Sequence, residues 1–354
     1  MAVRDVIIIG AGPSGLSAAI AAKRRGLDYQ VIEKGVLVNS IFNFPPQMIF
    51  FTTPELLEVG GLPFVSPYYK PTRAEALKYY RKVVDTYDLQ IAFEETVLSV
   101  EREGQVEAGG AGGSGEPAGD EAIFAIETRS ARGVRRMRHA RHVVFAIGYY
   151  EYPNFLGVPG EDLPHVHHYY GDPHPHYHQR VVIVGGGNSA AEWALELFRA
   201  GAHVTLVHRR PELKKTIKYW VRPDIENRIK EGSIAARFNT RLTEIRPTSI
   251  VVAPFDGEGG ERGKAGTAGG EEMAADAVFL LTGYHTDWEL MERAGILLGE
   301  RQVPTYHPET FETNVPGLFL AGGAICGRDT SNVFIENGRF HGEKIVETIA
   351  GRLL

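Results

Sequence analysis

The chain has 354 residues, more than a single domain core usually holds, so two domains are expected. With 43% hydrophobic and 23% charged residues, it can bury two cores. The formal net charge of −6 argues against nucleic acid as a partner, because binding a phosphate backbone needs an excess of Lys and Arg. No apolar run reaches the ~18 residues of a membrane span, and the start leads directly into a strand, so a cytoplasmic protein with no membrane partner is expected.

The opening segment combines a strand, a glycine-rich turn and a helix. The apolar run Val6–Ile9 predicts a buried parallel strand, and a helix is expected over Pro13–Arg25. In the turn between them, Gly10 allows a tight bend, Gly12 leaves room for a pyrophosphate, and Gly15 lets helix and strand pack closely. The N-terminus of the helix then presents N–H groups to the phosphates.

A carboxylate follows at the distance that a dinucleotide site requires. A second strand is expected over Tyr29–Ile32, and Glu33 stands at its tip, about 20 residues past the glycines, where it can hold ribose hydroxyls. Because the turn, the helix and the carboxylate occur together, a dinucleotide site is favoured over a chance strand-turn-helix.

The rest of the first domain contains one unusual stretch. Ser40–Tyr69 is crowded with aromatic residues and prolines, which indicate either a wall against a large flat ligand or ordinary core packing. A helix is expected over Thr72–Tyr87, and the glycine-rich stretch Glu107–Asp120 is expected to be an exposed hairpin loop. A later strand, Val143–Ile147, ends at Gly148.

The opening pattern then repeats. From Arg180, a strand leads into Gly185-x-Gly187-x-x-Ala190, a helix and another strand. In both repeats, 23 residues separate the first glycine of the turn from the tip of the second strand. Another glycine-rich loop, Gly257–Gly270, follows, and the strand after it ends at a glycine as in the first repeat. The sequence therefore predicts an internal duplication.

The tip of the second repeat has the opposite charge. His208, Arg209 and Arg210 stand where the first repeat has one carboxylate. A carboxylate would repel a 2′-phosphate, whereas arginine can bind it bidentately. The first site is thus expected to bind FAD or NAD, and the second to bind NADP. Lys214 and its neighbour Lys215 fit either an extended phosphate site or a solvated helix face.

The C-terminal elements have no counterpart in the second repeat. A strand over Thr313–Ala321 and a helix from about Asn332 to Arg352 most simply return to the first domain. The expected fold is α/β, with two Rossmann-like dinucleotide-binding domains and the NADP domain inserted in the FAD domain. The expected bounds are 1–155 with 285–354 for FAD and 156–284 for NADPH. Such a pair predicts a hydride relay from a nicotinamide to a flavin between the domains.

Other reactive residues are given plainer interpretations. Cys326 is the single cysteine, so no intrachain disulfide can form, and it is expected to be a dispensable, semi-buried residue. Six arginines between 129 and 141 fit a solvated hairpin strand better than a site for an acidic partner. Six histidines between 165 and 178 lie in the linker without an ordered set of carboxylate or thiolate ligands, so no metal is expected.

At this point the residues resemble the bacillithiol disulfide reductase family. The resemblance rests on the GAGPSG and GGGNSAAEWA turns, on ETNVPGLFLAGG and, most specifically, on Asn39–Phe64 and Asn332–Lys344. It implies paired domains of the thioredoxin-reductase type, FAD and NADPH as cofactors, and reduction of the disulfide of a low-molecular-weight thiol. Lys218 lies in IKYW, which is similar to the family's IKPW, and the resemblance implies a cofactor role for it.

Two positions depart from related patterns. Members often have cysteine where this chain has Ser14, and serine cannot form a mixed disulfide. Gly323 stands where generic thioredoxin-reductase-like enzymes place an aspartate that contacts the ribitol. No CxxC pair is present, so a dithiol relay is excluded. Either the acceptor meets the flavin directly, without a catalytic side chain, or this chain has another substrate.

The expected cofactor-binding residues come from both turns, both tips, the strand ends and the C-terminal segment. They are Gly10, Gly12, Pro13, Ser14, Gly15, Glu33, Lys34, Ser40, Val97, Ala146 and Gly148; Gly185, Gly187, Asn188, Ser189, Ala190, His208, Arg209, Arg210, Lys218 and Gly283; and Gly322, Gly323, Phe334 and Ile335. The expected partner is a small-molecule disulfide, and the protein is expected to be a homo-oligomer.

Two alternative functions stay open. A thioredoxin-reductase-like ferredoxin or flavodoxin–NADP reductase needs no cysteine, and rapid reduction of such a carrier with inert disulfides would select it. An FAD-bound redox sensor would hold FAD that NADPH cannot reduce. A flavin monooxygenase is disfavoured, because its FxGxxxH stretch before the second glycine turn is absent.

Overall fold

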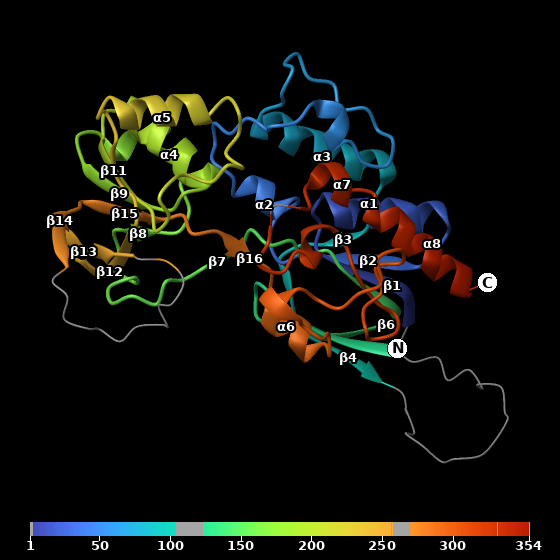
Figure 1. Cartoon of the computed structure of the whole chain (residues 1–354). Coiled ribbons are helices and arrows are strands. Elements are labelled where there is room, and N and C mark those ends of the chain that lie inside the picture. Colours follow the sequence, from blue (N-terminus) through green and yellow to red (C-terminus); the bar gives the residue numbers. More distant parts are fainter. Residues whose placement is uncertain (1–2, 104–122, 256, 258–269, 331, 354) are drawn as a thin grey trace. The chain divides into compact units, whose positions relative to one another are not determined.

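The computed structural model describes residues 3–103, 123–255, 257, 270–330 and 332–353. The loop expected at Glu107–Asp120 lies outside the described residues, and so does nearly all of Gly257–Gly270. The chain forms two compact units (Figure 1). The first unit contains Met1–Tyr152 and Tyr284–Leu354, and the second unit contains Pro153–Gly283.

A seven-stranded sheet forms the centre of the first unit. Its strands run in the order β3-β2-β1-β6-β5-β4, and β17 pairs with the second half of β6. The pairs β3–β2, β2–β1, β1–β6 and β6–β17 are parallel, whereas β6–β5 and β5–β4 are antiparallel. The strands are β1 (Val3–Ile9), β2 (Tyr29–Ile32), β3 (Ile91–Ala92), β4 (Glu95–Glu103), β5 (Ile123–Ser130), β6 (Arg135–Phe145) and β17 (Leu318–Leu320).

Helices from opposite ends of the chain pack together on this sheet. In Figure 1, α1 (Pro13–Arg24, blue) and α8 (His341–Leu353, red) lie side by side. Gly342 makes this possible, because a Cβ atom there would collide with the backbone of Ala18. The other helices of the unit are α2 (Asn39–Phe42), η1 (Pro54–Leu57), α3 (Arg73–Tyr87), α6 (Trp288–Arg293), η3 (Glu300–Gln302), η4 (Gly322–Ile325) and α7 (Ile335–Gly338).

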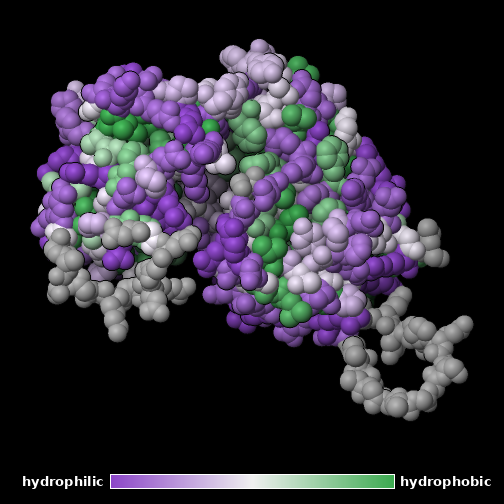
Figure 2. Space-filling view, in the orientation of Figure 1, coloured by the Kyte–Doolittle hydropathy of each residue, from purple (hydrophilic) through white to green (hydrophobic). Residues whose placement is uncertain are grey.

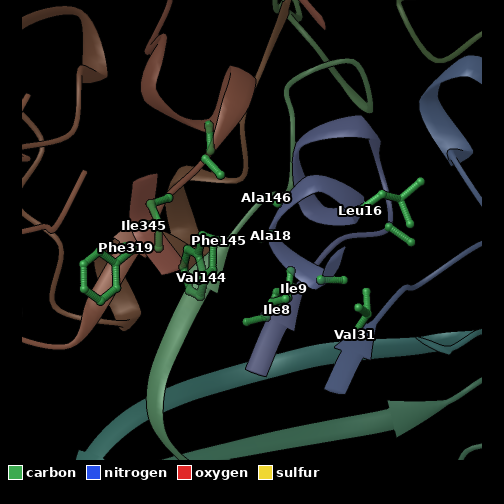
Figure 3. Packing of buried hydrophobic residues seen from close by; sticks show 14 of the residues in the cluster. Ile8, Ile9, Leu16, Ala18, Val31, Val144, Phe145, Ala146, Phe319 and Ile345 are labelled. Atoms are coloured by element: carbon green, nitrogen blue, oxygen red, sulfur yellow. The ribbon is translucent and has the colours of Figure 1, made fainter. Parts of the chain in front are cut away.

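The core of the first unit joins these layers. Ile8 of β1, Val144 of β6 and Phe319 of β17 are fully buried, as are Leu16 of α1 and Ile345 of α8. Figure 3 shows these side chains where the three strands meet the two helices. The apolar run predicted as a parallel strand is thus buried, and the helices packed on its sheet come from both ends of the chain.

Two C-terminal elements are shorter than the sequence predicted. The single helix expected over Asn332–Arg352 is wrong, because α7 and α8 are separate helices. The N–H of Phe334 donates to Oδ1 of Asn337 at 2.8 Å and caps the start of α7, which ends at Gly338 before α8 begins at His341. The strand expected over Thr313–Ala321 is limited to β17, because Pro316 has no N–H to donate to a neighbouring strand.

The aromatic stretch 40–69 divides between the core and the surface. Phe50 and Phe64 are buried, and the Phe64 ring stacks on Tyr79 of α3 with centroids 4.4 Å apart. Phe51 and Tyr68 are exposed. Core packing thus accounts for part of the stretch. Figure 2 shows that hydrophilic residues dominate the visible surface, with smaller apolar areas between them.

The second unit repeats the parallel arrangement in a smaller form. Its main sheet has the order β11-β10-β9-β15-β8, with parallel pairing throughout, and β12-β13-β14 form an antiparallel sheet. Its elements are β8 (Val166–His167), η2 (His174–His176), β9 (Arg180–Val184), α4 (Asn188–Arg199), β10 (His203–Val207), α5 (Arg222–Lys230), β11 (Ala235–Arg237), β12 (Thr240–Arg246), β13 (Ser249–Pro254), β14 (Glu271–Ala274) and β15 (Ala277–Leu280). At the two chain connections, β7 (Tyr152–Pro153) pairs with β16 (Tyr284–His285). No described helix has the length and apolar character of a membrane span.

Candidate functional site

The first glycine turn connects β1 to α1 and is crowded at two of its three glycines. A Cβ atom at Gly10 would collide with the carbonyl oxygen of Ala146, and one at Gly15 would collide with the carbonyl oxygen of Gly10. At Gly12, by contrast, no described atom lies within 4 Å of where a Cβ would stand. Protein packing therefore explains Gly10 and Gly15, whereas Gly12 keeps space free, as a bound pyrophosphate requires.

Glu33 at the tip of β2 is tied to this turn. Its carboxylate accepts the N–H of Ala11 at 2.7 Å through one oxygen and the N–H of Gly35 at 2.9 Å through the other. Burial raises the pKa of Glu33, and the two backbone hydrogen bonds oppose that shift. A carboxylate has about four acceptor positions. The two that remain can accept ribose hydroxyls, so the arrangement fits the expected role.

Lys34 faces a protein partner. Its ammonium group forms an ion pair with Glu151, whose other oxygen accepts from Asn39 Nδ2 at 2.7 Å. Burial alone would lower the pKa of Lys34, but the charge of Glu151 raises it overall. This contact ties the tip of β2 to the chain that follows β6. The cofactor role expected for Lys34 stays a prediction.

The C-terminal glycine pair lies beside the first turn. Gly322 has a φ of +63°, and a Cβ there would collide with the hydroxyl of Ser14. A Cβ at Gly323 would come within 2.6 Å of the Tyr149 ring and 3.7 Å of the Cα of Gly148. The fold thus brings together the first turn, the end of β6 and the glycine pair, which are separated by more than 300 positions in the sequence.

The remaining predicted residues of the first unit lie in α2, at the start of α7, in β4 and at the start of α1. Ser40 of α2 has its hydroxyl 4.0 Å from the position of a Cβ at Gly148. Phe334 and Ile335 lie at the start of α7, and the Phe334 ring contacts Phe51 edge-on, with centroids 5.3 Å apart. Val97 is buried in β4. Pro13 begins α1, a position that suits proline because its missing N–H is not needed there.

The second glycine turn connects β9 to α4 and has the same geometry. A Cβ at Gly185 would lie 2.5 Å from the carbonyl oxygen of Leu281, as Gly10 faces Ala146 in the first unit. At Gly187, the nearest described atom to a Cβ would be Cδ of Lys214, at 3.8 Å. The middle glycine of this turn therefore also keeps space free. Ala190 is fully buried at the third position.

The tip of β10 differs from its counterpart. The His208 side chain is buried, and its ring covers Gly186 so closely that a Cβ on that glycine would collide with it. Nε2 of His208 is buried and has no hydrogen-bond partner among the described residues. Burial, followed by the charges of Arg209, Lys214 and Arg210, lowers the pKa of His208. The buried Nε2 of His208 thus has no partner among the described residues, and Arg209, Lys214 and Arg210 gather positive charge near the ring, which suits a phosphate.

The lysines and the amide of this unit have separate contacts. Arg209, Arg210 and Lys214 are exposed. Lys218 forms an ion pair with Glu192 of α4, and its side chain is only 14% exposed. Asn188, at the start of α4, accepts the N–H of Lys218 at 2.8 Å and donates to the carbonyl of Thr216 at 3.2 Å. Asn188 and Lys218 therefore brace the segment after the tip.

Two further predicted residues lie at the same edge of the second unit, and both stay predictions. Ser189 follows Asn188 in the first turn of α4 and is partly buried. Gly283, after β15, has a φ of +100°, which favours glycine.

Comparison with known proteins decides the family. A sequence profile of pyridine nucleotide-disulphide oxidoreductases matches residues 7–108 and 118–322. The bacilliredoxin reductase Bdr of Bacillus subtilis (strain 168) is 38% identical over 350 residues, covering 98% of this chain and 97% of that protein. The chain belongs to the bacillithiol disulfide reductase family. Two solved structures titled bacillithiol disulfide reductase Bdr (YpdA) agree: the Bacillus cereus protein (36% identity, TM-score 0.88, 99% and 100% coverage) and the Staphylococcus aureus protein (35%, 0.87, 100% and 100%).

Membership of the bacillithiol disulfide reductase family establishes the class of chemistry. The chain is an NADPH-dependent flavin disulfide reductase, and its cofactors are FAD and NADPH. The expected fold of two Rossmann-like domains of thioredoxin-reductase type is confirmed. The space kept free at both middle glycines and the unsatisfied nitrogen of His208 fit two bound dinucleotides.

Cys326 and the histidines of the 165–178 segment are packed against other residues of the protein. Cys326 is buried after η4, and burial raises its pKa to about 11, so its reactive thiolate is disfavoured. Within the described residues, no group of three or more His, Cys, Asp or Glu side chains is arranged to hold a metal ion. The histidines of the 165–178 segment make ring contacts instead, as His176 does with Phe279 and Trp193.

Three residues at the first site escaped sequence reasoning. Tyr149 packs on Gly323, Glu151 pairs with Lys34, and His341 accepts the N–H of Gly322 at 3.1 Å. Tyr149 directly follows the glycine that ends a strand, which is a usable signal. Glu151 has no such signal, because its partner lies more than 100 residues away. His341 lies in the segment that resembles the family, but no local pattern shows what it contacts.

Proposed function

We propose that this chain reduces the disulfide of a low-molecular-weight thiol with NADPH, and that bacillithiol disulfide is its substrate. The reaction consumes one NADPH, one proton and one disulfide, and it yields NADP⁺ and two thiols. The relatives that span the whole chain carry the name of this reaction, which supports the substrate. The observation that carries the proposal is the pair of matching glycine turns with oppositely charged tips.

The opposite charges at the two strand tips assign a different dinucleotide to each unit. The first unit would hold FAD, with its pyrophosphate at Gly12 and a ribose at Glu33. The second unit would hold NADPH, with its 2′-phosphate near Arg209, Arg210 and Lys214. When bound, FAD supplies the two-electron chemistry that links NADPH to the disulfide. The protein residues bind and orient the dinucleotides.

No protein thiol takes part in this proposal. Ser14 stands where the family resemblance implies a cysteine, and its side chain faces Gly322. Cys326, the single cysteine, is buried with a raised pKa. A mixed disulfide with the protein is therefore disfavoured at both positions, and the acceptor would react at the flavin itself.

NADPH oxidation with bacillithiol disulfide tests the substrate. We expect the rate to exceed the oxidase background and to show saturation with the disulfide. The Cys326→Ala variant should retain this activity, because the Cys326 side chain is assigned neither a covalent step nor a cofactor contact. A rate no greater than the background would refute the substrate. Rapid reduction of ferredoxin or flavodoxin with inert disulfides would select the carrier reductase instead.

The homo-oligomer and the cytoplasmic location expected from the sequence stay predictions. Light scattering during size-exclusion chromatography tests the first, and a mass equal to one chain of 39.0 kDa would contradict it. Fractionation of cells that express the protein tests the second.

A further inference from the structure

The end of α7 and the start of α8 lie against Gly322. A Cβ at Gly338 would lie 3.1 Å from the Cα of Gly322 and 3.3 Å from the Ser14 hydroxyl. Three residues later, His341 begins α8, and the N–H of Gly322 donates to its Nδ1 at 3.1 Å. The Gly322 residue is buried, so its N–H needs a partner within the protein.

A stacked aromatic ring also holds the imidazole of His341 in place. Its ring stacks on Phe311, with centroids 4.2 Å apart and planes 22° apart. Burial, with a smaller contribution from the charge of Lys344, lowers the pKa of His341 to about 4. The ring is therefore neutral near pH 7, and a neutral ring can leave Nδ1 free of a proton to accept a hydrogen bond.

We propose that His341 is a positioning residue for FAD, which acts by fixing the Gly322–Gly323 turn through the hydrogen bond to Gly322. Gly322 has a left-handed φ of +63°, and the ring of Tyr149 covers Gly323. A small rotation of this turn would move both glycines relative to Ser14 and Gly148. The inference rests on the proposed assignment of Gly322 and Gly323 to the FAD site.

Two substitutions separate the hydrogen bond from the ring contact. His341→Asn places an amide oxygen near the position of Nδ1 and removes the ring, whereas His341→Phe keeps a ring on Phe311 and removes the acceptor. We expect the apoprotein of His341→Phe to bind FAD about tenfold more weakly, as an unsatisfied buried donor predicts, with a changed flavin absorption spectrum. The His341→Asn variant should stay within about threefold of the parent.

His142 provides a matched control in the same unit. It is buried, its Nδ1 bonds to the carbonyl of Asp5 at 3.1 Å, and its ring contacts Phe319. It pairs with Val6 in the middle of β1, rather than with the glycine turn that follows this strand. We expect His142→Phe to lower the melting temperature while FAD affinity changes by less than about twofold. If His341→Phe does not fold, His341→Leu serves instead, because leucine also removes the acceptor for the Gly322 N–H.

The outcome is read from FAD affinity and from the flavin spectrum, with no acceptor present. If a variant that lacks an acceptor for the Gly322 N–H binds FAD as tightly as the parent, the inference is overturned. It is also overturned if His341→Asn loses as much FAD affinity as His341→Phe. Because no disulfide is used, this result is independent of whether bacillithiol disulfide is the substrate.

Discussion

The two glycine turns of the chain both connect a parallel strand to a helix, and they differ in the residue that covers them. In the first unit, the slim carboxylate of Glu33 accepts the N–H of Ala11. In the second, the His208 ring lies on Gly186, which is the equivalent position. A methyl group is tolerated under a carboxylate and excluded under an imidazole. The comparison teaches that the variable residue of a G-x-G turn is set by the side chain at the tip of the next strand.

The largest effect is expected where the tip supports the turn directly. Glu33→Ala leaves the N–H groups of Ala11 and Gly35 without their partner, at a cost of about 2–4 kcal/mol in the free energy of unfolding. FAD affinity should fall about a hundredfold or more in a titration of the apoprotein. The FAD affinity of Glu33→Gln, which retains one carbonyl oxygen, should lie between those of the parent and of Glu33→Ala. An unchanged affinity in Glu33→Ala would remove Glu33 from the FAD site.

A substitution at the middle residue of each G-x-G turn tests whether the side chain at the strand tip decides which residue fits there. Gly186→Ala should cost about 2 kcal/mol in urea unfolding, because the new methyl group displaces the buried His208 ring. Combining it with His208→Ser should restore most of that loss. Ala11→Gly is the matched change in the first unit and should cost about 1 kcal/mol or less. Equal losses in the free energy of unfolding for Gly186→Ala and Ala11→Gly would show that the strand tips do not decide which residue fits in the turns.

The charge at the second tip should decide which nicotinamide cofactor is preferred. Arg209→Gln combined with Arg210→Gln should raise the KM for NADPH about tenfold, because charge-assisted contacts to a 2′-phosphate are lost. The KM for NADH should change little. Arg222→Gln is a suitable control, since Arg222 pairs with Glu226 on α5. A parallel rise for both cofactors would point to general damage to the unit.

The smallest effect concerns a property that both units share, a histidine whose pKa is lowered by burial. The pKa of His341 is lowered from 6.5 to about 4. Between these values the unfolded chain binds a proton that the folded chain does not, so stability falls as the pH drops from about 6.5 towards 4. For His341 the loss between pH 7 and pH 5 is about 1–2 kcal/mol. Urea unfolding of His341→Asn should show a correspondingly weaker pH dependence, and an identical slope would contradict the shift.

The sequence predicted the features that depend on neighbouring residues. The turns at Gly10 and Gly185 could be recognised because strand, glycines and helix follow one another within about 25 residues. The C-terminal elements were predicted too long, since contacts of Gly338 and the missing N–H of Pro316 are invisible to periodicity. The partners of Lys34 and Gly322 escaped because they depend on how distant segments pack. The glycine turns of the site were therefore predictable from the sequence, and the distant residues that contact Lys34 and Gly322 were not.

The path of the chain through the first unit has a consequence for its synthesis. β17 and α8, which complete the sheet and cover α1, leave the ribosome only after the whole second unit has been made. The second unit is continuous and can fold on emergence, whereas the first must wait for its last residues. A chain that terminates early would lack both the glycine pair and His341, so retention of the yellow cofactor would mark the molecules whose translation was completed.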